Sequence, residues 1–123
     1  KLELKDIYAI HGRAEELGRN VDYREKYDIA ISRAVASLNT LSEYALPFVS
    51  IGGHFISMKG PDVDEELNEG KKAIEILGGK IKSVEKIQIP DTDITHSLII
   101  IEKIKKTPTK YPRGGGKPRK QPL

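Results

Sequence analysis

The stretch from residue 27 to residue 60 constrains the fold more than any other part of this 123-residue chain. Residues 27–32 (YDIAIS) form a short apolar run, which is typical of a strand buried on both faces of a parallel sheet. Residues 37–49 repeat apolar side chains at helical spacing, and the pair Gly52-Gly53 is expected to end that helix. Residues 54–59 (HFISMK) predict a second strand. Parallel strands joined by a helix form a right-handed crossover, so the sequence predicts an α/β sheet.

Two cations stand where these strands end. Arg33 follows the first strand directly, and Lys59 closes the second. Ligands of open α/β sheets bind beyond the carboxyl ends of the strands, where a guanidinium can hold a carboxylate or phosphate with two hydrogen bonds. The pair therefore predicts a ligand site at this edge. The structural alternatives are a salt bridge from Arg33 to Asp28 or Glu43, and an ordinary strand-end lysine at position 59.

The remainder of the chain predicts a second helix and an antiparallel hairpin. Residues 62–77 carry an apolar stripe of helical spacing that stops at Gly78-Gly79. Residues 80–89 alternate only partly and suit the edge of a sheet, whereas residues 97–104 are rich in β-branched apolar side chains and suit its centre. The short turn between them favours antiparallel pairing. With an early strand expected at residues 7–12, the predicted fold class is a mixed α/β sheet.

The net charge of +3 conceals a division along the chain. Residues 105–123 carry seven Lys or Arg and no acid; subtracting them from 21 bases and 18 acids leaves 14 bases and 18 acids, or −4, in residues 1–104. Such asymmetry favours a polyanionic partner for the basic tail. Cysteine is absent, which excludes a thiolate zinc site, and the three histidines lack metal-ligand spacing. No apolar run reaches the roughly 18 residues of a membrane span, so a cytoplasmic protein without membrane or metal partners is expected.

Three blocks of the sequence occur in an order known from one enzyme family. They are HGRAEEL at residues 11–17, the segment 33–60 ending in SMKG, and KKTPTKYPR at residues 105–113. With these blocks the chain resembles the ribosomal small-subunit RNA guanine-N7 methyltransferases, also called glucose-inhibited division protein B, over almost its whole length. The resemblance implies the C-terminal half of a Rossmann-like, S-adenosylmethionine-dependent methyltransferase fold, with a mixed sheet ending in an antiparallel hairpin. The family's glycine-rich cofactor loop is expected upstream of residue 1.

The resemblance also assigns roles to particular residues. Ala14 and Glu15 match the pair that contacts the adenosine of S-adenosylmethionine, and Arg33 matches a cofactor-contacting arginine. Lys59 lies in the family's Lys-Gly strand ending and would face RNA. The tail matches the family's K-T-P-x-x-Y-P-R pattern, and the RNA contacts expected there are Lys110, Tyr111, Arg113, Lys117, Arg119 and Lys120. Without the resemblance, HGRAEEL is more simply a helix start with favourable acids, and the tail a disordered, solubilising end.

Residues 1–104 are therefore predicted to be a partial methyltransferase domain, and residues 105–123 a basic tail. The implied function is methylation of guanine N7 in 16S ribosomal RNA of the small ribosomal subunit, with S-adenosylmethionine as cofactor. Guanine N7 offers a lone pair and has no proton to lose, so methyl transfer requires no general base, and no catalytic residue is identified. Positioning of donor and acceptor is expected to supply most of the rate enhancement. The isolated fragment, without its glycine-rich loop, is expected to be inactive. The alternative is a non-enzymatic α/β RNA-binding module whose tail binds RNA and whose sheet is a scaffold.

Overall fold

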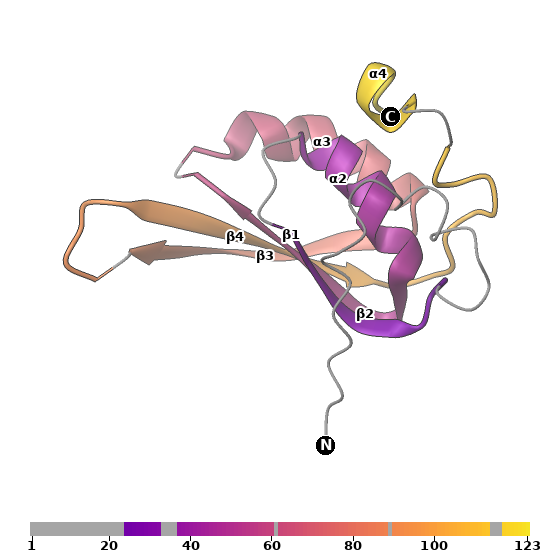
Figure 1. Cartoon of the computed structure of the whole chain (residues 1–123), viewed down its shortest axis with the longest axis horizontal. Coiled ribbons are helices and arrows are strands. Elements are labelled where there is room, and N and C mark those ends of the chain that lie inside the picture. The colour runs from indigo at the N-terminus through magenta and orange to yellow at the C-terminus, as the bar shows by residue number, and fades with distance from the viewer. Residues whose placement is uncertain (1–23, 33–36, 61, 89, 114–116) are drawn as a thin grey trace.

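The computed structural model describes residues 24–32, 37–60, 62–88, 90–113 and 117–123 (Figure 1). The strand expected at residues 7–12 and the expected cofactor residues Ala14, Glu15 and Arg33 lie outside these ranges. The described elements are β1 (Tyr27–Ser32), α2 (Leu38–Ala45), the 3-10 turn η2 (Leu46–Phe48), β2 (Val49–Lys59), α3 (Asp64–Ile76), β3 (Gly79–Gln88), β4 (Thr95–Lys103) and α4 (Lys117–Lys120).

The four described strands form one sheet in the order β1-β2-β4-β3. The β1 and β2 strands pair in parallel, and β4 pairs antiparallel with both β2 and β3. This confirms the predicted mixed sheet with a closing antiparallel hairpin, including the central place of β4 and the edge place of β3. Helices α2 and α3 lie side by side on one face of the sheet (Figure 1).

The core lies between that face and the two helices. Along β4 every second residue from Ser97 to Lys103 is buried, as expected where one face of a strand is covered. Phe55 of β2 stands opposite Ile101 of β4 and continues the same buried layer. The helices complete the core with large aliphatic side chains, and its main members are Ala30, Leu38, Leu41, Leu46, Val49, Phe55, Val63, Ile74, Leu77, Ile99 and Ile101.

The first helix ends earlier than the sequence predicted. Helix α2 stops at Ala45, because Pro47 has no N–H with which to continue the helical hydrogen bonds. The chain then passes through η2 and enters β2 at Val49. Gly52 and Gly53 therefore lie inside a strand, and the prediction that they end the helix was wrong.

These two glycines instead shape the pairing of β1 with β2. Between the pairs Tyr27↔Val49 and Ile29↔His54, β1 advances by two residues while β2 advances by five (54 − 49), so β2 bulges there. Gly52 has φ +92°, a backbone angle that residues with a side chain rarely adopt. A Cβ on Gly53 would lie 2.6 Å from the backbone oxygen of Asp28. The bulge thus requires glycine for both conformation and space.

The second helix begins and ends as predicted. Helix α3 carries three acids in its first turn, which favour the positive end of the helix dipole. It stops before Gly78, whose φ of +93° reverses the chain into β3. The Gly78 carbonyl then accepts hydrogen bonds from the N–H groups of Ile104 and Lys105, at 2.8 and 3.1 Å. One glycine therefore joins the end of α3 to the end of β4.

Replacing Gly78 with alanine should destabilise the fold by at least about 2 kcal/mol. The new Cβ would force an unfavourable positive φ and would lie 2.3 Å from the backbone oxygen of Lys105. Urea unfolding of the complete protein chain measures the effect. The matched control is Gly60→Ala, because an added Cβ there meets nothing within 4 Å, and its change should stay within about 0.5 kcal/mol. Equal stabilities of the two variants would contradict this account of the α3–β3 turn.

Candidate nucleic-acid interface

The carboxyl ends of the two parallel strands are neighbours in the sheet. Ser32, the last residue of β1, stands opposite Ser57 of β2, two residues before Lys59. The predicted adjacency of the two strand ends is thereby confirmed, whereas Arg33 itself lies outside the described residues. Ligands of parallel α/β sheets bind beyond such an edge.

Lys59 makes an ion pair with α3. Its Nζ lies 2.8 Å from Oε2 of Glu66, and only 9% of its side chain is exposed. Glu66 belongs to the first turn of α3, so the pair ties the end of β2 to the start of the next helix. The sequence left open that Lys59 is an ordinary strand-end lysine, and the ion pair with Glu66 is such a structural role. Contact of Lys59 with RNA stays a prediction.

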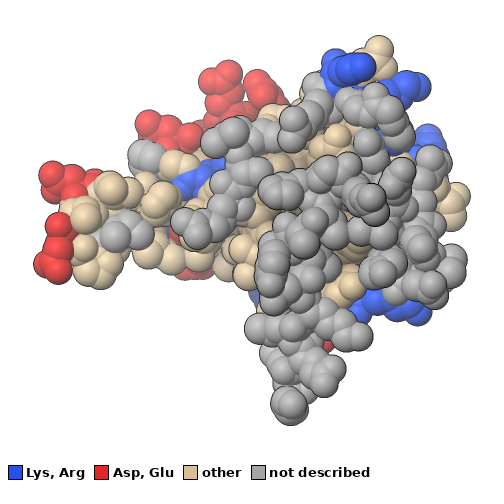
Figure 2. All heavy atoms as spheres, viewed as in Figure 1, with Lys and Arg blue, Asp and Glu red and all other residues tan. Residues whose placement is uncertain are grey.

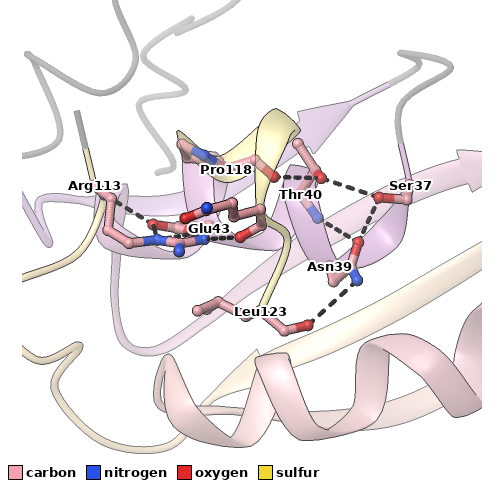
Figure 3. A network of polar contacts seen from close by, with 8 residues as sticks. Ser37, Asn39, Thr40, Glu43, Arg113, Pro118 and Leu123 are labelled. Carbon is pink, nitrogen blue, oxygen red and sulfur yellow. Dashed lines mark hydrogen bonds and ion pairs between the residues drawn. The ribbon is translucent and has the colours of Figure 1, made fainter. Parts of the chain in front are cut away.

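The start of α2 is organised by side chains. Ser37 occupies the N-cap position but makes no capping hydrogen bond to the helix backbone. Its hydroxyl instead donates to Oδ1 of Asn39, which also accepts the N–H of Thr40 at 2.8 Å (Figure 3). Asn39 therefore satisfies a backbone donor of the first turn in place of Ser37.

The basic tail lies along α2. The Thr40 hydroxyl donates to the Pro118 carbonyl at 2.8 Å, and the Asn39 side-chain amide contacts the Leu123 carbonyl at 3.4 Å (Figure 3). Closer to the helix C-terminus, Arg113 binds Glu43. The tail thus runs from the Glu43 end of α2 toward its N-terminus. Because α2 starts six residues after the end of β1 (38 − 32), this path brings the tail toward the carboxyl edge of the sheet.

Glu43 and Arg113 form the best-satisfied ion pair of this interface. Glu43 is fully buried and accepts the Arg113 backbone N–H at 2.8 Å, its Nε at 3.0 Å and its Nη2 at 2.8 Å (Figure 3). The hydrogen bonds that the Arg113 side chain donates to this carboxylate raise the pKa of Arg113. In the described part of the chain, Glu43 is therefore the partner of the tail, whereas the sequence had offered it as a partner of Arg33.

Lys103 is a buried cation that the sequence reading missed. Its Nζ donates to the carbonyls of Leu46 and Val49 at 2.7 and 2.8 Å and lies 3.0 Å from Oε2 of Glu25. Burial lowers the pKa of Lys103, and Glu25 opposes that shift. The available signal was the alternation of β4, which places position 103 on the same face as Ile99 and Ile101.

The beginning of the tail is held by the connector before β1. Arg24 donates to the carbonyls of Thr107, Pro108 and Tyr111 at 2.7 to 2.9 Å. The Thr107 N–H donates to Glu25 at 2.9 Å, and its hydroxyl donates to the Leu77 carbonyl at 2.6 Å. In its described parts, the segment predicted as a separate tail is packed on the body.

Of the residues expected to contact RNA, some are held against the body of the protein and others are exposed. The Tyr111 ring belongs to the core and only 6% of the residue is exposed, so a base cannot stack on it in this conformation. The Arg113 guanidinium donates hydrogen bonds to Glu43 and to the Gln121 carbonyl. Both residues are held by the body of the protein in this structure, and their contact with RNA stays a prediction. The lysines at 110, 117 and 120 are exposed, and the side chain of Arg119 lies outside the described part.

Charge is divided between the two ends of the molecule. Figure 2 shows acidic side chains at the tip of the β3–β4 hairpin and along α3, and basic side chains on the side of α4. Exposed acids of the first group include Asp91 and Asp93 in the hairpin turn. Lys117 and Lys120 of α4 are exposed cations of the second group, and Lys105, Lys106 and Lys110 in the preceding segment are exposed as well. A polyanion is therefore attracted to one end and repelled by the other.

The described residues contain no group of three or more His, Cys, Asp or Glu side chains that could hold a metal ion. None of their helices has both the length and the apolar composition that crossing a membrane would require.

Comparison with known proteins gives consistent results. The sequence profile of the family described as rRNA small subunit methyltransferase G matches residues 1–95. The chain is 55% identical over all 123 residues to "Ribosomal RNA small subunit methyltransferase G" of Alkaliphilus metalliredigens (strain QYMF), covering 52% of that protein. It is 53% identical over its whole length to the protein of the same name from Clostridium novyi (strain NT), covering 51% of it. The chain thus spans about half the length of the curated relatives that it matches.

One solved structure also shows a partial likeness. The crystal structure of M. jannaschii TYW2 in complex with AdoMet aligns with a TM-score of 0.47 and 18% identity, over 71% of this chain and 43% of that one. At this level the likeness carries no argument about fold or function.

Neutralising Glu25 should remove an acid-sensitive contribution to stability. Burial raises its pKa, but the Thr107 N–H and the Lys103 ammonium outweigh that effect and hold the pKa below 4.5. A carboxylate with a lowered pKa stabilises the fold above pH 4.5, and this contribution disappears as pH falls through its folded-state pKa. Glu25→Gln should therefore cost about 2 kcal/mol at pH 7, and this cost should shrink as the pH falls below 4.5. Urea unfolding across this range measures the gap, with the exposed Glu69→Gln as control; a gap that does not change with pH would refute the assignment.

Proposed function

Because this chain belongs to the rRNA small subunit methyltransferase G family, we propose that it forms the C-terminal half of an S-adenosylmethionine-dependent enzyme that methylates guanine N7 in small-subunit ribosomal RNA. The observation that carries the proposal furthest is the seating of the basic tail on α2. Through the contacts of Thr40 with Pro118 and of Asn39 with Leu123, a cationic segment approaches the edge where β1 and β2 end. A cofactor held at that edge and an RNA held by the tail would meet there.

The cofactor is proposed to bind at the ends of the parallel strands. Glu15 and the backbone N–H groups around Ala14 suit the amino group and ring nitrogens of adenine, which need one acceptor and one donor. Arg33, directly after β1, suits a carboxylate, which a guanidinium can hold with two parallel hydrogen bonds. The donor set therefore fits S-adenosylmethionine, which supplies a methyl group on a sulfonium when bound.

The chemistry leaves the chain a task of positioning. Guanine N7 attacks with an in-plane lone pair and has no proton to remove, so neither a general base nor a covalent intermediate is required. Holding donor and acceptor in line converts an encounter of two molecules into a step within one complex, which can contribute several kcal/mol, up to about 7–11. The elements that can do this here are the strand ends and the anchored tail.

The RNA substrate is proposed to contact the tail lysines and Lys59. Lys110, Lys117 and Lys120 are exposed and extend from a segment whose backbone is fixed at both ends. The acidic hairpin tip at the other end of the molecule would turn away from RNA, so the charge division orients the approach (Figure 2). Arg119 is included by its position in the same segment.

Methyl transfer can be tested directly with the complete protein. Small-subunit ribosomal RNA is incubated with S-adenosylmethionine carrying a labelled methyl group, and modified positions are mapped by strand cleavage specific for N7-methylguanine. The expected result is label at guanine N7 that requires the protein. Label at another atom, or binding of RNA without any transfer, would reject the proposal.

Arg33 and Lys59 should act on different ligands. Arg33→Ala should weaken S-adenosylmethionine binding about tenfold to a hundredfold in the absence of RNA, because a charged hydrogen bond is lost. Lys59→Ala should leave cofactor affinity within about twofold and weaken RNA binding. Calorimetry for the cofactor and filter binding for RNA measure the two effects. Thermal unfolding serves as the control for Lys59, since its pair with Glu66 also joins β2 to α3. Equal effects of both substitutions on both ligands would contradict the division.

A further inference from the structure

We propose that Glu43 is a positioning residue for the RNA surface, because through Arg113 it holds the described tail residues 117–123 on α2. This inference rests on the proposed function for the identity of the polyanion. It does not follow from the charge of the tail, because Glu43 is an acid and by charge alone would oppose RNA binding.

Glu43 has its contacts concentrated on a single tail residue. Its side chain is fully buried in α2, where an ionised carboxylate persists only if it is paired and hydrogen-bonded. Both of its oxygens contact the Arg113 guanidinium, and Oε2 also accepts the Arg113 backbone N–H. The backbone contact fixes the path of the chain, which a charge pair between flexible ends would not do.

Arg113 extends this anchor to the end of the tail. Its Nη2 donates to the carbonyl of Gln121, the residue that follows α4, at 2.6 Å. Thr40 and Glu43 are three residues apart and therefore share a face of α2, and Thr40 donates to the Pro118 carbonyl within α4. The described tail residues are thus attached at Arg113, at Pro118 and at Gln121.

Apolar side chains of residues 117–123 pack against the body of the protein, whereas the lysines of this segment are exposed. Pro118 is buried, and Leu123 packs against the hydrophobic core. Lys117 and Lys120, on either side of this inward contact, are exposed. Two ammonium groups are therefore presented outward from a backbone that is already ordered. Binding to a phosphate backbone then requires less loss of conformational freedom than binding by a disordered tail.

The decisive variant is Glu43→Gln in the complete protein. It keeps the shape of the side chain but removes its charge, so the bidentate pair with Arg113 is lost. The proposal expects faster hydrogen exchange in residues 113–123 and RNA binding weakened about fivefold to twentyfold, with unchanged S-adenosylmethionine affinity. Glu69→Gln, at an exposed position of α3, is the matched control. Both substitutions raise the net charge by one, so electrostatics alone predicts slightly tighter RNA binding for both.

Weaker RNA binding by Glu43→Gln together with slightly tighter RNA binding by Glu69→Gln would therefore identify Glu43 as a positioning residue. If Glu43→Gln leaves hydrogen exchange in the tail unchanged, or loosens the tail without weakening RNA binding, the proposal is rejected. Should Glu43→Gln unfold the protein, Thr40→Val replaces it, because that change removes the bond to Pro118 without altering charge; the same loosening and weaker RNA binding are expected. A protein that binds RNA in this Glu43-dependent way but transfers no methyl group would reject the proposed function and leave the positioning role intact.

Discussion

The structure depends on a lysine ammonium that is buried where three segments meet. An unpaired charge in a protein interior is strongly unfavourable, so Lys103 constrains everything that must approach its Nζ. The two carbonyls it binds belong to the η2–β2 junction, and its carboxylate partner Glu25 belongs to the connector before β1. Removing Lys103 or Glu25 leaves the other charge without this ion-pair partner. The early end of α2, the entry into β2 and the course of the connector are thereby coupled.

The same network explains why the tail belongs to the body. Oε2 of Glu25 contacts both the Lys103 ammonium and the Thr107 N–H, and its neighbour Arg24 binds three carbonyls of residues 107–111. The first part of the tail is therefore attached to the buried ion pair of Lys103 and Glu25. The later part is attached to α2 through Glu43 and Thr40. Together these contacts hold the described parts of the basic tail on the body of the protein.

Sequence reasoning predicted the elements with strong local signals. The β1 strand, α3 and the β3–β4 hairpin follow from apolar runs, a helical stripe and a short turn, and the order of the sheet agrees with them. It placed the end of α2 at the glycine pair because glycine commonly ends helices, but Pro47 acts first and the glycines serve a strand bulge. The contacts of Lys103 with Leu46, Val49 and Glu25, and the pair of Glu43 with Arg113, join residues 54 to 78 positions apart (103 − 25 for the longest). Such pairings leave no periodic trace in a single sequence.

The close approach at Gly53 has a consequence for the edge of the sheet. Its missing Cβ lets the backbone of β1 come within 2.6 Å of where a side-chain carbon would stand, at the Asp28 carbonyl. Asp28 lies only four residues before Ser32, the last residue of β1. The absence of a side chain at Gly53 therefore lets the two parallel strands lie close together a short distance before their carboxyl ends. A larger residue at this position would push β1 and β2 apart near the edge at which ligands of such sheets bind.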